Sequence, residues 1–372
     1  MIKILYTIPN FITAGSGQAL LHVVKRLDRN LFEPSIAVLK TGGALEQEIE
    51  ALGIPLLELP FTVPPRPLTK LPIRIIQSAK LFRPYEFDIW HSYHYSDDYT
   101  EPLIARMAGA KAWVYTKKNM GWGSRAWWIR SRLASRIPSQ NTTMMSRFFN
   151  TPSFSKKAQL VPPGVDTAYY RPQVLAELAV RQKYNIDSHI PLIGCIAHLV
   201  EVKDHPNLIK ALAKVPEAHL ILAGKLLDRE YVQRLEALIK DLELMDRVHF
   251  LGNVENIPAL HAELDMFVLP TMGRLRMEGC PVALLEAMAC ETPAIATDIP
   301  GPNDVIIPNH SGLLVPPENP DSLADAINSL IANPEHRKKM GINGRQRVLD
   351  GYTIQHEVQT LEAIYNELII RQ

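Results

Sequence analysis

The chain has 372 residues, of which 47% are apolar, so it is long enough for two hydrophobic cores. Its 40 basic and 39 acidic residues leave a formal net charge of +1, which excludes a global electrostatic attraction to nucleic acid. Cys195, Cys280 and Cys290 fit a reducing compartment better than a disulfide scaffold, and no run of about 18 apolar residues could span a membrane.

Short apolar runs alternate with longer segments of helical periodicity from the first residues onward. The opening run ends at Pro9-Asn10 and predicts a strand rather than a signal peptide, so we expect a cytoplasmic protein. The proline-rich segment Pro60–Pro72 predicts a loop at the edge of an acceptor site. In the first half the predicted strands are Ile2–Ile8, Ser35–Leu39, Phe87–His91, Ala112–Thr116 and Thr142–Ser146, and the predicted helices are Gly15–Leu27 and Glu101–Met107.

The same alternation continues in the second half and predicts an α/β protein with parallel sheets covered by helices on both faces. Proline and glycine in Val161–Asp166 predict a boundary between a domain over residues 1–165 and one over residues 166–351. Doubly wound domains bind ligands at the carboxyl ends of their strands, which would face one another across a cleft. The predicted elements of this half are the strands Leu192–Ala197, His219–Ala223, Val248–Leu251, Met266–Leu269, Ala294–Thr297 and Gly312–Val315, and the helices Pro206–Lys214, Glu230–Leu242, Pro258–Glu263 and Asp321–Ala332.

Two carboxylates, Glu278 and Glu286, flank the start of a short apolar helix predicted over Val282–Cys290. Pro281 suits the first helical position because its missing N–H would be unpaired there, and Pro293 marks the end. The free N–H groups and the positive dipole end at this point favour an anion. A ligand that carries both phosphates and hydroxyls, such as a nucleotide-sugar, therefore fits this segment.

Along nearly its whole length the chain resembles the family 4 glycosyltransferases, which have the GT-B fold of two Rossmann-like domains. The family's pair of glutamates matches Glu278 and Glu286, which have seven residues between them. The other matching motifs are, in chain order, Pro163-Gly164-Val165-Asp166, Ala197–Lys203, Ala223-Gly224, Phe250-Leu251-Gly252, Pro300–Asp304 and Gly312–Val315. Their common order and spacing carry the resemblance.

The resemblance implies a retaining sugar transfer from a nucleotide-diphosphate sugar to a hydroxyl acceptor, in polysaccharide or glycolipid biosynthesis. It implies an N-terminal acceptor-binding domain, a C-terminal donor-binding domain and a final helix, residues 352–372, that crosses back to the first domain. By residue matching, Glu286 would hold the ribose hydroxyls, Glu278 the sugar hydroxyls and Lys203 the diphosphate. No cofactor is implied, and because the chain has no Asp-x-Asp motif we expect no metal.

One position departs from the family, because His198 stands where an arginine is usual. Arginine grips phosphate with a permanent charge, whereas histidine is largely neutral near pH 7. Lys225, directly after Ala223-Gly224, is our candidate for a compensating cation. The resemblance completes the donor-binding set, which is Gly15, Gly17, Lys225, Val254, Gly279, Cys280, Pro281, Val282 and Glu286.

Four residues are predicted to act in catalysis, namely Glu278, Lys203, His198 and His94. His94 follows a predicted strand and is a candidate hydrogen-bond partner of the acceptor, with a structural role as the alternative; its neighbour His91 fits a structural role better. Lys117-Lys118 is interpreted as a solvated pair, although its position after the strand Ala112–Thr116 would direct it toward the cleft. Gly15-Ser-Gly17 is predicted to be a ligand-contacting loop, with an ordinary tight turn as the alternative.

A predicted helix after residue 122 interleaves aromatic with basic side chains, which suits docking on the anionic inner face of a membrane. The alternative is an ordinary amphipathic helix whose tryptophans pack inward. The residues predicted to contact lipid are Trp122, Arg125, Trp127, Trp128, Arg130 and Arg132.

Two other functions remain open at this point. One is a nucleotide-sugar epimerase or a phosphorolytic enzyme of the same fold, and the other is a non-catalytic nucleotide-sugar sensor. The presence of Glu278, Glu286 and Lys203 disfavours a sensor, while His198 slightly favours it.

Overall fold

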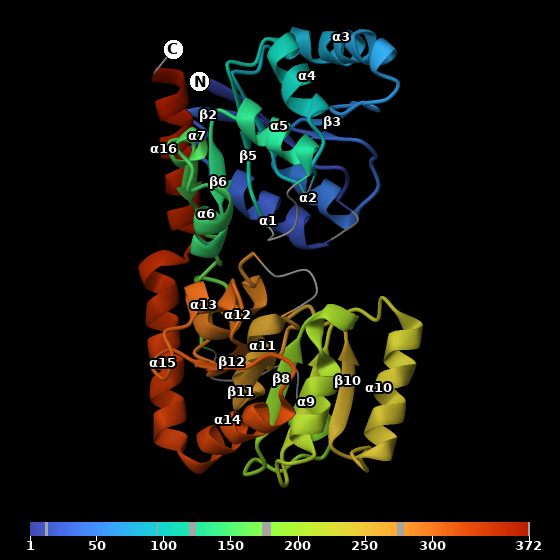
Figure 1. Ribbon diagram of the computed structural model, residues 1–372. Coiled ribbons are helices and arrows are strands. Elements are labelled where there is room, and N and C mark those ends of the chain that lie inside the picture. Colours follow the sequence, from blue (N-terminus) through green and yellow to red (C-terminus); the bar gives the residue numbers. More distant parts are fainter. Residues whose placement is uncertain (12–13, 95, 119–123, 173–179, 274–278, 371–372) are drawn as a thin grey trace. The chain divides into compact units, whose positions relative to one another are not determined.

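The computed structural model describes the chain except residues 12–13, 95, 119–123, 173–179, 274–278 and 371–372 (Figure 1). The chain forms two compact units, one of Met1–Pro163 with Ile354–Gln372 and one of Gly164–Thr353. These limits lie within two residues of positions 165 and 351, where the sequence places the boundaries. Each unit is built around its own parallel sheet.

The sheet of unit 1 has five parallel strands in the order β3-β2-β1-β4-β5. Strand β1 lies at its centre, with Ile4 opposite Pro34 on one side and Ile89 on the other. The strands are nearly continuous apolar runs, as expected for a sheet buried on both faces. They span Ile2–Thr7 (β1), Phe32–Val38 (β2), Leu56–Glu58 (β3), Ile89–Ser92 (β4) and Ala112–Tyr115 (β5), and a second, two-stranded sheet pairs Ile137–Ser139 (β6) with Ala158–Leu160 (β7).

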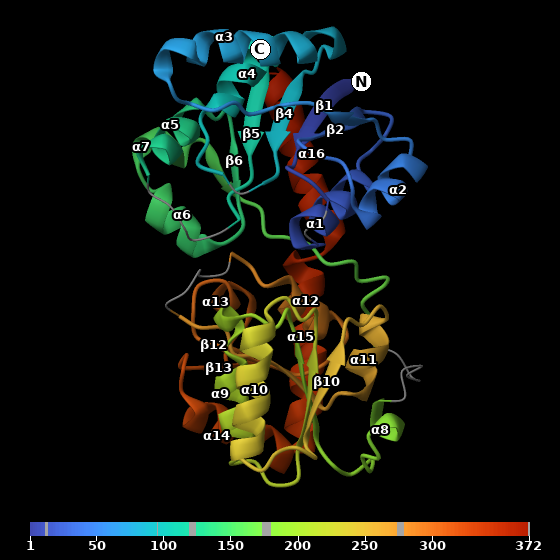
Figure 2. The same ribbon diagram turned by 90° about the vertical axis from the view of Figure 1, so that its right-hand side faces the viewer.

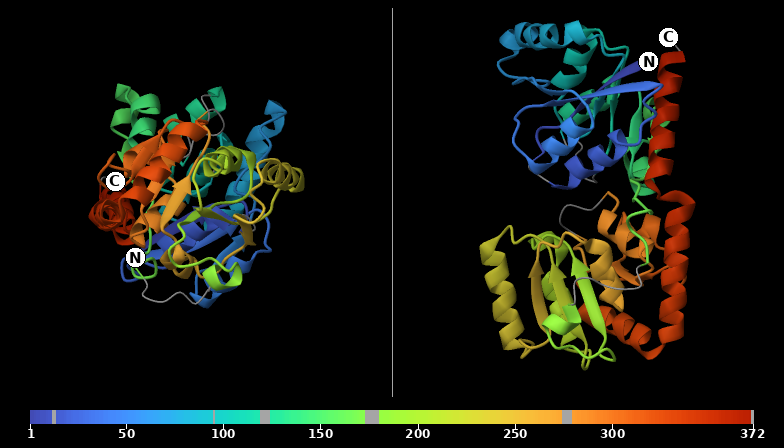
Figure 3. Two further views of the ribbon diagram at one scale, coloured as in Figure 1. Left: turned by 90° about the horizontal axis from the view of Figure 1, so that it is seen from below. Right: turned by 180° about the vertical axis from the view of Figure 1, so that it is seen from behind.

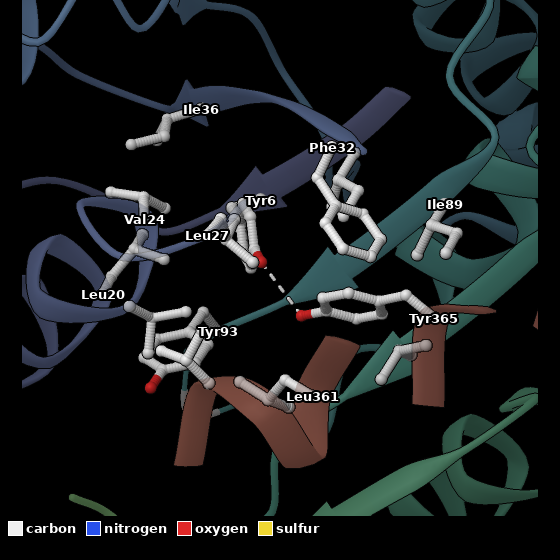
Figure 4. Packing of buried hydrophobic residues seen from close by; sticks show 14 of the residues in the cluster. Tyr6, Leu20, Val24, Leu27, Phe32, Ile36, Ile89, Tyr93, Leu361 and Tyr365 are labelled. Atoms are coloured by element: carbon white, nitrogen blue, oxygen red, sulfur yellow. Dashed lines mark hydrogen bonds between the residues drawn. The ribbon is translucent and has the colours of Figure 1, made fainter. Parts of the chain in front are cut away.

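Helix α16 (Ile354–Ile370) belongs to unit 1 although it ends the chain, and Figure 3 shows it from behind. It packs with α1 (Ala14–Val24) against the sheet, and the hydroxyls of Tyr6 and Tyr365 are hydrogen-bonded at 2.9 Å in that core (Figure 4). The final segment thus returns to the first unit. The other helices of unit 1 are α2 (Ala44–Ala51), α3 (Leu71–Phe82), α4 (Thr100–Ala108), α5 (Arg125–Leu133), α6 (Thr142–Phe148) and α7 (Pro152–Ser155), with 3₁₀ turns η1 (Leu68–Lys70) and η2 (Arg83–Tyr85).

The sheet of unit 2 has six parallel strands in the order β10-β9-β8-β11-β12-β13. Alternate residues of each strand enter two different cores, because helices lie on both sides of the sheet (Figure 2). From β8 the chain adds β9 and β10 on one side of the sheet, and it then adds β11, β12 and β13 on the other side. Doubly wound sheets bind ligands at such a switch point, which here lies between β8 and β11. The strands are Leu192–Ile196 (β8), His219–Ala223 (β9), Val248–Gly252 (β10), Met266–Leu269 (β11), Ala294–Thr297 (β12) and Leu313–Val315 (β13).

The helices of unit 2 agree with the sequence in their order, and the structure adds a long helix, α15, that the sequence did not predict. They are α8 (Val180–Lys183), η3 (Glu201–Lys203), α9 (His205–Leu212), α10 (Arg229–Asp241), α11 (Ile257–Glu263), α12 (Val282–Ala289), α13 (Pro302–Val305), α14 (Pro320–Ala332) and α15 (Pro334–Gly351). No described helix has the length and hydropathy that crossing a bilayer requires.

Two segments of the first half differ in secondary structure from the prediction. The predicted strand Thr142–Ser146 is part of helix α6, because the side chain of Asn141 accepts a hydrogen bond from the backbone N–H of Met144 and so caps a helix start. The predicted loop Pro60–Pro72 ends early, since helix α3 begins at Leu71 with a proline in its first turn, where proline is tolerated.

Candidate functional site

Helix α12 of unit 2 begins at Val282, as the sequence predicts, and ends at Ala289, one residue earlier than predicted. Pro281 is its N-cap, with φ −78° and ψ 106°, and the helix then runs for eight residues. Gly279, Cys280 and Pro281 are buried, whereas the side chain of Val282 is 38% exposed. Glu278 lies outside the described residues.

Glu286 is the acidic residue of this otherwise apolar helix. Its carboxylate accepts a hydrogen bond from the hydroxyl of Tyr170, while part of its surface remains exposed. Burial raises the pKa of Glu286 and the Tyr170 hydrogen bond acts in the opposite direction. A ligand hydroxyl that donates a hydrogen bond to this carboxylate would stabilise its negative charge. Sequence reasoning missed Tyr170, because nothing near it in the chain indicates that it contacts Glu286.

Three basic side chains gather where β8 and β9 end. Partial burial lowers the pKa of His198, and the positive charges of Lys225 and Lys203 lower it further, which places the three near one another. His198 and Lys225 are exposed and Lys203 is half-buried. The structure thus brings together three of the predicted residues. Two lysines beside an imidazole whose pKa is lowered are a donor set that suits a diphosphate.

Gly224, just before Lys225, has a structural reason to be glycine. Its φ is +152°, and a Cβ there would lie 2.0 Å from the carbonyl oxygen of Ala197. Its N–H donates to the carbonyl of Gly252 at 2.7 Å, so three strand ends meet at this point. Val254 lies just beyond β10, and its half-buried side chain packs against the core that includes residues of β9 and α11.

The Gly15-Ser-Gly17 segment is not a loop, because both glycines lie in the first turns of helix α1. A Cβ on Gly17 would lie 2.9 Å from Phe11 Cδ1 and 3.2 Å from Leu45 Cδ1, so packing explains that glycine. Gly15 is exposed, and among the described residues no atom would lie within 4 Å of a Cβ placed there. Of the two, Gly15 is therefore the one whose backbone a ligand can approach.

His94 belongs to a buried polar network centred on Glu101. Its Nε2 lies 3.3 Å from Glu101 Oε2, and Arg130 donates to that same oxygen at 2.9 Å. Ser92 and Trp90, both from strand β4, also donate to Glu101. Burial alone would raise the pKa of Glu101, but the charges of Arg130 and His94 hold it well below its usual range. His94 is thus held rigidly beside the carboxyl end of β4.

The predicted lipid contact through Trp127 and Arg130 is wrong, because both side chains are fully buried. Trp127 packs against the ring of Phe148, and Arg130 pairs with Glu101 from another helix. The alternative interpretation, an amphipathic helix with tryptophan packed inward, holds for Trp127. Arg125, Trp128 and Arg132 are exposed, and Trp122 lies outside the described residues.

Lys117 and Lys118, directly after strand β5, are not a solvated pair but are 3% and 5% exposed. The Nζ of Lys118 lies 3.3 Å from the centre of the Tyr93 ring. Burial lowers the pKa of both lysines to about 7. In the sequence, the position of these two lysines directly after a predicted strand was the one feature that indicated a functional role.

His91 is structural, as the sequence favoured. Its ring nitrogens are hydrogen-bonded to the Tyr365 hydroxyl at 2.7 Å and to the Thr116 hydroxyl at 2.8 Å. Burial lowers its pKa to about 3, so the ring stays neutral.

Comparison with known proteins finds a family match over part of the chain. Residues 177–347 match the family described as "Glycosyl transferases group 1". The chain is 31% identical over 216 residues to the GDP-mannose-dependent alpha-(1-6)-phosphatidylinositol monomannoside mannosyltransferase of Mycolicibacterium smegmatis, covering 56% of each chain. It is 28% identical over 218 residues to the N-acetyl-alpha-D-glucosaminyl L-malate synthase of Bacillus anthracis, covering 58% of this chain and 55% of the relative. The chain thus spans about half the length of the curated relatives it matches.

Solved structures with the same fold extend over the whole chain. A glycosyltransferase from Rickettsia africae superposes with a TM-score of 0.88 at 20% identity, over 99% of this chain and 98% of that one. HepE from Anabaena, in complex with UDP and glucose, gives a TM-score of 0.83 at 20% identity, over 99% of this chain and 100% of that one. The chain therefore has the GT-B fold that the sequence predicts.

Proposed function

We propose that this chain, whose residues 177–347 belong to the group 1 glycosyl transferases, is a retaining glycosyltransferase that uses a nucleotide-diphosphate sugar. The observation that carries the proposal is the group of His198, Lys203 and Lys225 at the strand ends of unit 2. The same unit holds Glu286, the one acidic residue of an otherwise apolar helix, which is partly exposed. A nucleotide-sugar needs two kinds of contact, namely cations beside its diphosphate and a hydrogen-bond acceptor beside its ribose hydroxyls.

The basic group supplies the main electrostatic contribution in this proposal. As the bond between sugar and diphosphate breaks, negative charge grows on the phosphate oxygens. Lys203 and Lys225 are fixed near that charge, and so they stabilise the transition state more than the ground state. His198 adds a hydrogen bond without a permanent charge. The N-terminus of α12 at Pro281 adds its dipole. Because these groups can neutralise the leaving diphosphate, we propose that the reaction needs no metal.

Glu286 accepts hydrogen bonds from the ribose hydroxyls in this proposal, and Tyr170 holds its carboxylate in place. Glu278 and the backbone of Gly279–Cys280 are proposed to bind the hydroxyls of the transferred sugar. Val254 is proposed to contact the base through its backbone, with its half-buried side chain packed against a core. These contacts involve the common parts of nucleotide-sugars and leave the choice of base to the backbone.

Unit 1 is proposed to bind the acceptor at the carboxyl ends of its strands. Gly15 offers an open helix start, His94 a rigidly held imidazole, and Lys118 a buried amine. Among the described residues, Lys118 Nζ has no hydrogen-bond partner, so an acceptor oxygen could occupy that position. In a retaining reaction the departing phosphate can take the acceptor's proton, and none of these groups then has to act as a base.

A donor screen tests the proposal. The Mycolicibacterium smegmatis relative is named as GDP-mannose-dependent and HepE was solved with UDP-glucose, so both donors are included together with an ADP-sugar. Slow hydrolysis of one donor without acceptor is expected, and proton NMR should show that the released sugar first has the donor's anomeric configuration. Inversion would contradict the retaining mechanism, and an epimerised donor would favour an epimerase. Binding of every donor without cleavage would favour a sensor.

A further inference from the structure

Helix α3 of unit 1 is packed on one side only. Its inner face buries Ile75, Ser78, Ala79 and Phe82, whose spacing is that of one helix face. The Phe82 ring lies 4.7 Å from the ring of Trp90 in the sheet. Figures 1 and 2 both show α3 on the outside of the unit, next to α4. This face accounts fully for the attachment of the helix to the fold.

The opposite face of α3 carries aliphatic side chains where a solvated helix has polar ones. Ile73, Ile76 and Leu81 are 59%, 37% and 44% exposed, and Leu68 in the preceding turn is 66% exposed. Single exposed aliphatic residues are common on protein surfaces. Here Ile73 lies opposite the buried residues, Ile76 and Leu81 lie on either side of it, and Gln77 and Lys80 stand among them. We call the three aliphatic residues of this mixed face the apolar strip.

The same segment is strongly basic. Between Glu58 and Glu86 there is no acidic residue, whereas the whole chain is almost balanced at +1. Two of the arginines donate to backbone carbonyls: Arg74 donates to those of Pro64 and Arg66, and Arg83 donates to that of Met107. In the described part of the chain neither of them forms an ion pair with a carboxylate. The five cations are Arg66, Lys70, Arg74, Lys80 and Arg83, all exposed except the half-buried Arg74.

We propose that residues 68–83, the α3 face, dock this protein on an anionic membrane surface. Ile73, Ile76 and Leu81 would enter the boundary between headgroups and acyl chains, while Lys70 and Lys80 lie over anionic headgroups. A nucleic acid would attract the cations but gain nothing from the aliphatic strip. An acidic protein would also leave that strip against polar groups. This surface is separate from helix α5, to which the sequence pattern pointed, and the inference does not depend on which sugar is transferred.

Flotation of the whole protein with vesicles tests the docking. Co-flotation is expected with vesicles that contain phosphatidylglycerol, and it should weaken as salt rises and be lost with phosphatidylcholine alone. Ile73→Gln with Leu81→Gln, and separately Lys70→Glu with Lys80→Glu, should each lower the bound fraction at least tenfold. All four side chains are exposed, so the fold should tolerate these changes.

Matched controls lie on unit 2. Leu226→Gln with Leu227→Gln changes two similarly exposed aliphatic residues, and Lys338→Glu with Lys339→Glu makes the same change of charge. Both controls should float like the unmodified protein. Absence of co-flotation at low salt would overturn the proposal. So would equal losses in the controls, or a loss on changing Trp128 and Arg132 of α5 that the α3 variants do not show.

A local probe separates docking from simple adsorption. The three native cysteines are buried, so Ile73→Cys offers an exposed thiol for an environment-sensitive fluorophore. A blue shift on adding phosphatidylglycerol vesicles is expected at position 73 and not in a Lys338→Cys control. An unshifted spectrum at position 73 while the protein floats would show that the apolar strip does not enter the membrane, and would contradict the proposed mode.

Discussion

Lys117 shows at the scale of one residue how burial conflicts with charge. Its amine lies 5.1 Å from the Trp127 ring centre and 4.9 Å from that of Phe148, and burial lowers its pKa to about 7. An unfolded lysine titrates near pH 10.4, so between these values the folded state binds fewer protons. Lys117 therefore lowers the stability below pH 10, and its full cost is present below about pH 7.

Replacing Lys117 tests this directly. Lys117→Met should raise the midpoint of thermal unfolding at pH 7, with a gain of about 1 kcal/mol or more, and the gain should disappear above about pH 10. The exposed Lys156→Met serves as the control and should change little. A variant that is less stable than the unmodified protein at pH 7 would show that the amine makes a favourable contact stronger than its desolvation cost.

Helix α5 shows at the scale of an element why sequence pattern and structure diverge. Its pattern of basic and aromatic residues fits two kinds of helix equally well. One is a helix that faces lipid, and the other is a helix anchored in the fold by one buried ion pair. What decides is Glu101, which lies on α4 and receives Arg130 at 2.9 Å. The exposed face of α5 consists of Arg125, Trp128, Ile129 and Arg132, at helical spacing. A pattern within the helix cannot reveal a partner that lies 29 residues away in the chain.

Arg130 and Arg132 form a matched pair on this helix. Arg130→Ala should lower the free energy of unfolding by about 3–5 kcal/mol, because Glu101 would remain buried without its main cation. Arg132→Ala should change it by less than about 0.5 kcal/mol. Urea unfolding followed by circular dichroism measures both. Equal, small effects would mean that Arg130 is a surface residue, contrary to the structure.

At the scale of the whole molecule, buried histidines couple stability to pH. Burial lowers the pKa of His91 and His261 to about 3 and that of His205 to about 4, against about 6.5 when unfolded. The stability they confer is thus present above about pH 6.5 and is lost as the pH falls toward 4, with a slope of up to ~1.4 kcal/mol per pH unit for each group.

His261 offers the clearest test of that coupling, since neither of its ring nitrogens has a hydrogen-bond partner among the described residues. The unfolding midpoint of the unmodified protein should fall steadily between pH 7 and 4.5. His261→Phe should make this fall less steep, while the exposed His189→Phe should leave it unchanged. If the unfolding midpoint falls equally steeply with pH in all three proteins, His261 does not contribute to the pH dependence of stability.

The fold was largely predictable because most strands are continuous apolar runs between turn residues. Strands β9, β11 and β12 begin and end at the predicted residues. Strands β3, β6 and β7 were missed, since three residues carry too little periodicity to be recognised. In the candidate site, a local motif was enough to predict the place of Lys203 just after β8 and of Glu286 on α12, while their roles stay predictions. Tyr170 and the burial of Lys118 depend on residues distant in the chain, and no local pattern encodes them.

The central claim is that unit 2 binds a nucleotide-diphosphate sugar through its basic group and Glu286. Calorimetric titration of UDP-glucose and GDP-mannose tests it most directly, using the unmodified protein, Glu286→Ala, and the exposed Glu236→Ala as control. We predict that one donor binds, that Glu286→Ala weakens this binding by about 1–3 kcal/mol, and that Glu236→Ala has no effect. An unchanged affinity in Glu286→Ala, or no binding of either donor to the unmodified protein, would contradict the account.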